Sequence, residues 1–201
     1  MSVAFENVSF AYDKTKVLDG VTWRLPDRGV VCLWGASGCG KTTALRLLAG
    51  LEKPSVGVVH RADRVAMVFQ EDRLLPWRTA LANVTVTGVD EAAARELLTK
   101  LGLTEEEINA YPRHLSGGQQ RRVALARALA ADSDMLLLDE PFNGLDEGTW
   151  MDVVPLIQRA AESRPVVLVT HIREQVLALD AAVLPLGEAP QTGEWKTTEF
   201  L

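Results

Sequence analysis

A glycine-rich segment at residues 35–42 constrains this chain more than any other feature. It reads Gly-Ala-Ser-Gly-Cys-Gly-Lys-Thr and matches the whole phosphate-binding pattern G-x-x-x-x-G-K-[ST]. The apolar run at residues 30–34 predicts a buried strand before it, and residues 43–49 predict a helix that ends at Gly50. A glycine loop between a strand and a helix turns backbone N–H groups and the positive end of the helix dipole toward an anion. The chain is therefore expected to bind a nucleoside triphosphate.

Two side chains of this loop have specific chemical roles. Lys41 supplies a mobile positive charge for the β- and γ-phosphates, and the Thr42 hydroxyl is a ligand for Mg²⁺. The alternative is an ordinary glycine-rich turn that ends in Lys-Thr, and the flanking strand and helix patterns disfavour it. The residues expected to contact the nucleotide here are Gly35, Ala36, Ser37, Gly38, Cys39, Gly40, Lys41, Thr42 and Thr43.

The composition is typical of a folded protein. The 201 residues are 47% hydrophobic and 24% charged, which suits one domain with a sizeable core. The net charge of −6 argues against non-specific electrostatic binding of nucleic acid, so no nucleic-acid partner is expected. Cys32 and Cys39 show no disulfide pattern, the N-terminus lacks signal-peptide features, and no apolar stretch approaches the ~18 residues of a membrane span. We expect a cytoplasmic chain that reaches a membrane only through a partner.

Strand and helix patterns alternate along the chain. This alternation predicts a mostly parallel sheet covered by helices, and the two N-terminal strands predict a small antiparallel part. From about residue 79 to residue 131 the pattern is wholly helical, which indicates a helical subdomain over about residues 71–131, inserted in a single domain of residues 1–201. Short loops are expected between Leu51 and Arg64, and the tail after Gly187 shows no clear pattern. Strand patterns occur near residues 3–10, 17–25, 65–69, 135–138, 165–169 and 182–186, and helical ones near 90–101 and 147–161.

An acidic pair follows the apolar run at residues 136–138. The run predicts a buried strand, which places Asp139 at the carboxyl edge of the sheet beside the phosphate-binding loop. Asp139 is expected to hold Mg²⁺ through water, and the adjacent Glu140 to polarise the water that attacks the phosphate. The alternative is a strand that simply ends in a solvated acidic turn.

Residues 115–120 read Leu-Ser-Gly-Gly-Gln-Gln and are followed by Arg121 and Arg122. This segment resembles the signature motif of the ABC-type ATPases. Gln70 comes directly after a predicted strand and resembles the Q-loop glutamine of the same family. The resemblance extends over nearly the whole chain, from about residue 3 to residue 186.

Three further positions fit the order of motifs in that family. Residues 141–146 resemble the D-loop, in which Asn143-Gly144 is unusual but Asp146 is in place. His171 follows the strand predicted at 165–169 and resembles the switch histidine, although a lone histidine there is more often structural. Tyr12 sits where the family has an aromatic residue that stacks on adenine; simple packing near a strand end is the alternative.

The resemblance implies a P-loop NTPase fold of ABC type, in the α/β class, that hydrolyses ATP with Mg²⁺. It implies a composite site in which Ser116, Gly117, Gly118 and Gln119 meet a phosphate bound by a second ATPase subunit. It also implies that Gln70 senses the metal and the γ-phosphate, and that His171 contacts the γ-phosphate and the attacking water.

The segment at residues 69–77 is similar to the one after the Q-loop in importers of nitrate, sulfonate, taurine and related small solutes. Exposed Leu74, Leu75 and Trp77 would suit contact with a permease. The alternative is that Trp77 packs into the helical subdomain. The resemblance therefore implies an import ATPase on the inner face of the cell membrane, with permease subunits and a solute-binding protein as partners. An exporter or lipoprotein-release ATPase, or a soluble ABC-type ATPase, is the alternative function.

Overall fold

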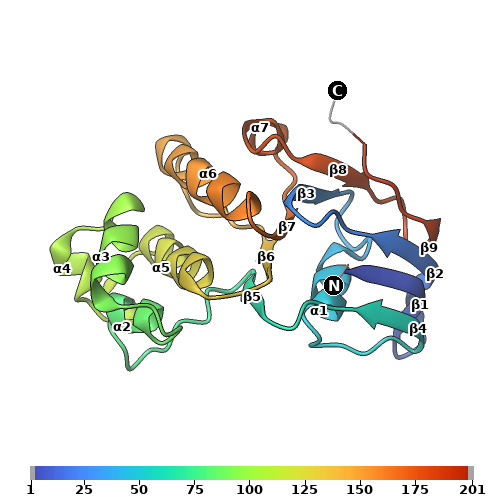
Figure 1. Ribbon diagram of the computed structural model, residues 1–201, viewed down its shortest axis with the longest axis horizontal. Coiled ribbons are helices and arrows are strands. Elements are labelled where there is room, and N and C mark those ends of the chain that lie inside the picture. The colour runs from blue at the N-terminus through green and yellow to red at the C-terminus, as the bar shows by residue number, and fades with distance from the viewer. Residues whose placement is uncertain (1–2, 199–201) are drawn as a thin grey trace.

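The computed structural model describes residues 3–198, which form two sheets with helices between and beside them. A four-stranded sheet lies at one end of the molecule, a five-stranded sheet lies in the middle, and helices α2–α5 lie at the other end (Figure 1). The first helix, α1 (Lys41–Leu48), packs between the two sheets. The α/β fold class predicted from the sequence is confirmed.

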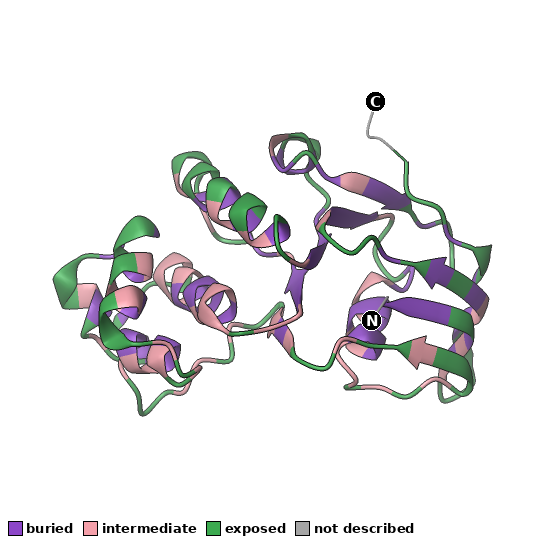
Figure 2. Ribbon diagram, viewed as in Figure 1, coloured by how far each residue is buried: buried purple, intermediate pink, exposed green. Residues whose placement is uncertain are grey.

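The five-stranded sheet is entirely parallel and has the strand order β5-β6-β7-β3-β8. Its core strands are buried on both faces (Figure 2), as their continuous apolar runs predict. Alternate residues enter different cores: Leu136 and Leu138 pack with the helices α5 and α6, whereas Leu137 packs with α1. The strands are β3 (Gly29–Trp34), β5 (Val65–Val68), β6 (Met135–Asp139), β7 (Pro165–Val169) and β8 (Ala182–Pro185).

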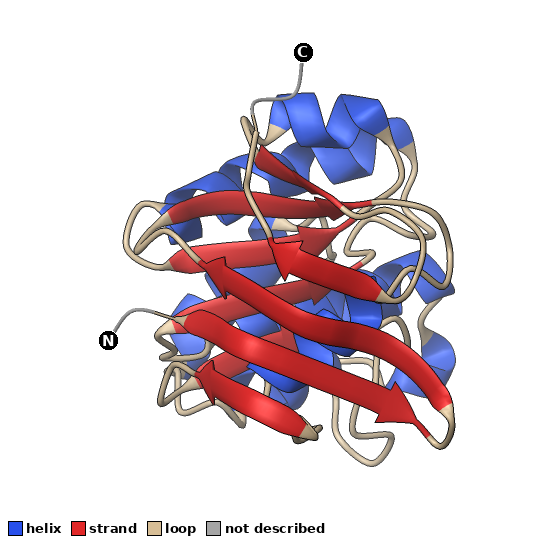
Figure 3. Ribbon diagram, turned by 90° about the vertical axis from the view of Figure 1, so that its right-hand side faces the viewer, coloured by secondary structure: helices blue, strands red, loops and turns tan. Residues whose placement is uncertain are grey.

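The four-stranded sheet has the order β4-β1-β2-β9. Strands β1 (Ala4–Tyr12) and β2 (Thr15–Arg24) form an antiparallel hairpin, whose turn places Asp13 in the left-handed region with φ 50°. Strand β4 (Val56–His60) pairs antiparallel with β1, and β9 (Gln191–Glu194) pairs parallel with β2. In Figure 3 these strands lie in front and the helices lie behind them.

Helices α2 (Ala80–Thr85), α3 (Glu91–Lys100) and α4 (Glu105–Ile108) pack beside α5 (Gly117–Ala130). Asp90 caps α3 by accepting a hydrogen bond from the Ala93 amide, in agreement with the sequence pattern. Helices α6 (Glu147–Ala161) and α7 (Arg173–Ala178) lie beside the parallel sheet, on the side of β7, β3 and β8 (Figure 1). Among residues 3–198, no helix combines the length and apolar character needed to cross a membrane.

The structure corrects the sequence analysis in three segments. Residues 51–64 contain strand β4. Its side chains are mostly exposed, so the sequence shows no alternation of buried and exposed residues that would predict a strand. The tail contains strand β9, whose order comes from pairing with β2 rather than from local sequence. Helix α7 is only 6 residues long and has too few apolar positions for its pattern to be recognised.

Candidate nucleotide-binding and catalytic site

A cavity of about 610 Å³ lies at the carboxyl edge of the parallel sheet. The strand order makes this possible, because β3, β6 and β7 are neighbours and their carboxyl ends meet at one edge. The cavity brings together Tyr12, Gln70, Glu140, His171 and most of the phosphate-binding loop, as the sequence predicted. Its walls consist of Tyr12, Val17, Gly35, Ala36, Ser37, Gly38, Gly40, Lys41, Thr42, Thr43, Gln70, Asp139, Glu140, Val169, Thr170 and His171.

The phosphate-binding loop has the backbone that its glycines allow. Gly40 has φ 106°, a conformation that other residues rarely adopt. Gly40 is also the N-cap of α1, and since no side chain caps the helix, its first N–H groups are left for an anion. The Lys41 ammonium lies over the loop and donates to the carbonyl oxygens of Gly35 and Ala36, both at 2.7 Å. The loop therefore presents a helix N-terminus and a mobile cation to the same cavity.

The Thr42 hydroxyl donates a hydrogen bond to Oδ2 of Asp139 at 3.1 Å, although the two residues lie far apart in sequence. Asp139 is only 4% exposed, and this burial raises the pKa of its carboxyl group, partly offset by the Thr42 hydrogen bond. A hydroxyl and a carboxylate that converge in this way fit Mg²⁺, which takes few protein ligands and prefers oxygen donors and phosphate. Thr42 and Asp139 are therefore the candidate metal ligands.

Glu140 follows β6 directly and has φ 50°, a left-handed conformation unusual for a residue with a side chain. Its amide donates to the carbonyl oxygen of Val169 at 3.0 Å, which fixes it to the end of β7. Its Oε1 lies 3.9 Å from Nδ1 of the exposed His171. The neighbouring Thr170 is held by a hydrogen bond between its hydroxyl and the side chain of Gln175. A carboxylate and an imidazole thus face the cavity from neighbouring strands.

Tyr12 and Gln70 line the same cavity. Tyr12 packs edge-to-face on Phe10 with ring centroids 4.8 Å apart, and its hydroxyl accepts a 3.4 Å hydrogen bond from Arg46. Part of the Tyr12 ring nevertheless remains exposed, so packing does not use its whole surface. Gln70 is exposed just after β5.

The signature residues and Asp146 do not line this cavity. Ser116 caps α5 by accepting a 3.3 Å hydrogen bond from the Gln119 amide, and the Gln119 side chain accepts one from the Ser116 amide at 2.6 Å. Asp146 caps α6, and its hydrogen bonds from Thr149 lower the pKa of its carboxyl group. In one chain, therefore, these groups are separate from the phosphate-binding loop.

Cys39 was predicted to contact the nucleotide through the loop, but its side chain does not line the cavity and is only 2% exposed. Its carbonyl oxygen accepts a 3.0 Å hydrogen bond from Gln191 of strand β9, which the sequence analysis missed. Gln191 gave no signal because it lies in a polar tail and reaches the loop only through the pairing of β9 with β2. Buried Arg121 belongs to the segment that resembles the signature, and the sequence alone predicts no role for it.

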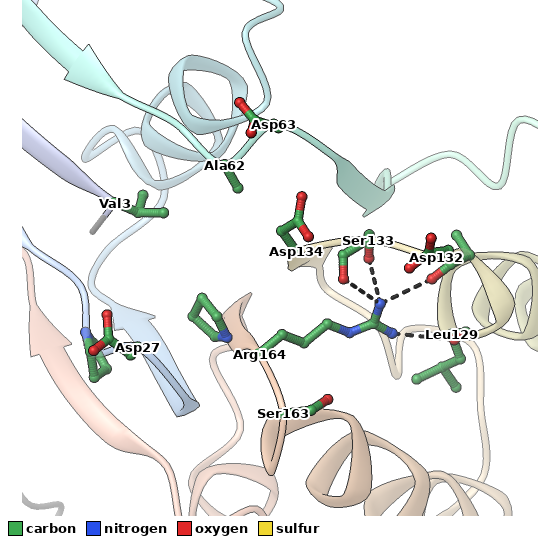
Figure 4. Close-up of a pocket in the computed structure, with 13 residues that line it drawn as sticks. Val3, Asp27, Ala62, Asp63, Leu129, Asp132, Ser133, Asp134, Ser163 and Arg164 are labelled. Atoms are coloured by element: carbon green, nitrogen blue, oxygen red, sulfur yellow. Dashed lines mark hydrogen bonds between the residues drawn. The ribbon is translucent and has the colours of Figure 1, made fainter. Parts of the chain in front are cut away.

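A second cavity, of about 820 Å³, lies at the opposite, amino edge of the parallel sheet (Figure 4). Here Arg164 donates to backbone oxygens of Leu129, Ala131 and Ser133. Burial lowers the pKa of the Arg164 guanidinium from its usual value. This cavity contains none of the residues predicted for nucleotide chemistry.

Comparison with known families shows to which family of nucleotide-binding proteins this site belongs. The profile of the ABC transporter family matches residues 18–143, which include the phosphate-binding loop, the signature, and Asp139 and Glu140 at the end of β6. The chain belongs to the ABC transporter family. The resemblance inferred from the motif order is thereby confirmed.

Relatives in this family support the same assignment. An aliphatic sulfonates import ATP-binding protein of Paraburkholderia xenovorans is 42% identical over 92% of this chain and 76% of its own length. One of Rhodococcus jostii is 44% identical over 90% of this chain and 77% of its own length. The predicted resemblance to importer ATPases is therefore confirmed.

Solved structures agree with the fold. The dimeric structure of a bacterial ABC transporter cassette, MJ0796, is 27% identical, has a TM-score of 0.84, and covers 99% of this chain and 100% of its own. A post-hydrolysis state of that cassette, bound to ADP and phosphate, has a TM-score of 0.81 at 28% identity and covers 98% of each chain. As an ABC-type ATPase, this chain binds ATP with Mg²⁺ and hydrolyses ATP to ADP and phosphate.

Proposed function

We propose that this chain is the ATP-hydrolysing subunit of an importer, in which two ATPase subunits act on membrane permease subunits. The observation that carries the proposal is the 42–44% identity to import ATP-binding proteins over nine-tenths of the chain. Since those relatives are named for aliphatic sulfonates, a small sulfonate is the first solute to test. A solute-binding protein would deliver it, and the ATPase would work at the inner, cytoplasmic face of the membrane.

The whole chain, residues 1–201, would form one ATPase domain, with the helical subdomain at about 71–131. Lys41 and the loop amides would bind the β- and γ-phosphates, and Tyr12 would stack on the base. Thr42 and Asp139, with Gln70, would hold Mg²⁺, which supplies positive charge next to the phosphates. Glu140 would accept a proton from the attacking water, and His171 would contact the γ-phosphate.

The signature residues would serve the second subunit. Their place outside the cavity of their own chain supports this role. Ser116 and Gly117 are exposed at the start of α5, and the amides of Gly117 and Gly118 take no part in the capping box of Ser116 and Gln119, so they can meet a phosphate from another molecule. Asp146, at the start of α6, would lie in the same interface.

The 70–77 segment supports a permease contact. Trp77 is 70% exposed, which contradicts the alternative that it packs into the helical subdomain. Leu74 and Leu75, expected to be exposed, are half-buried instead, and Leu74 packs on the core. Buried Asn83 holds this loop by bonding to both the amide and the carbonyl of Leu75, at 2.7 and 3.1 Å. The result is an ordered loop that presents one large aromatic side chain to a partner.

The test is to recover the tagged chain from native membranes and to compare wild type with Trp77→Ala. We expect a multi-span permease to accompany the wild type and to be largely lost with the variant, while ATPase activity of the isolated chain is unchanged. Met151→Ala, which removes another exposed apolar side chain on α6, is the matched control and should retain the permease. Recovery of the chain with DNA or ribosomes, without a permease, would contradict the proposal.

A further inference from the structure

Arg121 is a buried charged side chain near the start of helix α5, and it is only 2% exposed. Burial of a guanidinium is costly unless its N–H groups are satisfied. Arg121 satisfies them with oxygens from two other segments, which approach α5 from the carboxyl edge of the parallel sheet. These partners lie 18 to 52 positions from Arg121 in the sequence.

The first of these segments is the end of strand β6. Nη2 of Arg121 donates to the carbonyl oxygens of Asp139, at 2.9 Å, and of Glu140. Nε donates to the carbonyl oxygen of Pro141 at 3.2 Å. One side chain therefore holds three successive backbone carbonyls that begin at the candidate metal ligand.

The second segment follows strand β5. Nη1 of Arg121 donates to the carbonyl oxygen of Phe69 at 2.6 Å and to Oδ1 of Asp72 at 3.0 Å. These two residues flank the Gln70 and Glu71 positions, and they lie at the start of the loop that presents Trp77. The same guanidinium thus joins this loop to the end of β6.

The hydrogen bond from Arg121 to Glu140 matters because the backbone of Glu140 has an unfavourable conformation. With φ 50° it occupies the left-handed region, which is disfavoured for a residue with a side chain. Val169 accepts a hydrogen bond from the Glu140 amide, and Arg121 donates one to the Glu140 carbonyl oxygen. The peptide groups on both sides of the Glu140 side chain are therefore fixed, and Arg121 fixes the second.

We propose that Arg121 is a positioning residue that joins three parts of the ATPase into one body: Asp139–Glu140, the 70–72 segment, and the start of helix α5 with Ser116. The inference rests on the proposed function, in which Ser116 completes the site of the second subunit. Movement of the 70–77 loop at a permease would then shift the catalytic carboxylate and the signature together. Only the planar fork of arginine, with five N–H donors, can satisfy all these oxygens.

Arg121→Lys tests this role, because it keeps the positive charge and removes the fork. We expect kcat for ATP hydrolysis to fall by up to about 10²-fold, the cost of misplacing a reacting group. The affinity for a fluorescent ATP analogue should change less than about threefold, because Arg121 does not touch the phosphate-binding loop. A kcat within about twofold of wild type in a folded Arg121→Lys protein would overturn the inference.

Arg164→Lys is the matched control, since Arg164 also donates to backbone carbonyls but lies at the opposite edge of the sheet (Figure 4). It should lower the melting temperature and leave kcat nearly unchanged. If both variants lose kcat in proportion to their loss of melting temperature, Arg121 is structural only and the inference is wrong.

Asp72→Asn gives an independent test that leaves the Arg121 guanidinium and its hydrogen bonds to backbone carbonyls in place. It removes the carboxylate of the Asp72–Arg121 ion pair but keeps an oxygen that can accept the hydrogen bond, so the protein should fold and kcat should fall less than in Arg121→Lys, with ATP affinity unchanged. An unchanged kcat in Asp72→Asn would also overturn the inference if Arg121→Lys does not fold. Failure of the proposed function is distinguishable, because it would appear in wild type as an absence of a permease partner.

Discussion

Glu140 combines a disfavoured backbone conformation with a carboxylate side chain that can act as a general base. Its φ of 50° is maintained by hydrogen bonds to Val169 and from Arg121. Strained residues of this kind persist where the surrounding structure holds them, and they are concentrated at functional sites. The carboxylate is thereby directed into the cavity that contains the phosphate-binding loop.

Glu140→Gln should preserve ATP binding and lower turnover. The amide keeps the shape of the side chain but cannot accept a proton, so kcat should fall by about 10²–10⁴-fold, the usual contribution of a general base. Steady-state hydrolysis and equilibrium binding of an ATP analogue separate the two effects. Glu162→Gln, at an exposed position after α6, should behave as wild type. A Glu140→Gln protein that hydrolyses ATP at the wild-type rate would exclude Glu140 as the base.

At the scale of elements, the short strand β9 supports the phosphate-binding loop from outside the nucleotide site. Buried Gln191 donates to the carbonyl oxygen of Cys39 at 3.0 Å and to that of Gly187 at 2.8 Å. Strand β9 is itself positioned by β2, in which Leu18 lies opposite Gln191. The tail therefore contributes to the geometry of the loop.

Gln191→Met should weaken ATP binding without removing catalysis. Methionine has a similar length but no N–H group, so the Cys39 carbonyl would be left without its donor, at a cost of about 1–3 kcal/mol in the free energy of unfolding. If about 1 kcal/mol of this appears in binding, the affinity for ATP falls about fivefold. Thr192→Ala, at the exposed neighbouring position of β9, should leave both quantities unchanged. Equal effects of the two variants would mean that β9 acts only through general stability.

At the scale of the whole molecule, the sequence was most informative where local pattern and chemistry coincide. The buried strands of the parallel sheet are continuous apolar runs, so their ends, and with them Asp139 and His171, could be placed at one edge. Strand β9 could not be predicted, because its order depends on pairing with β2. The contacts of Arg121 could not be predicted either, because its partners are mostly backbone carbonyls, which every residue has and which therefore leave no pattern in the sequence. The exposure of Trp77 also required the structure, since a tryptophan after Gln70 fits packing and docking equally well.

In the function proposed above, two copies of this chain together form each ATP site. Lys41→Ala removes the cation of the phosphate-binding loop, and Ser116→Arg blocks the start of α5. Each variant alone should be inactive, because every site in its homodimer is defective. In a heterodimer of the two, one site combines the intact loop of the Ser116→Arg chain with the intact signature of the Lys41→Ala chain.

ATP hydrolysis by a mixture of Lys41→Ala and Ser116→Arg chains is therefore the most direct measurement. Differently tagged chains allow the heterodimer to be purified and its hydrolysis compared with that of each homodimer. We expect activity to be recovered in the heterodimer, with one competent site for each pair of chains. A purified heterodimer as inactive as the two parent variants would contradict it.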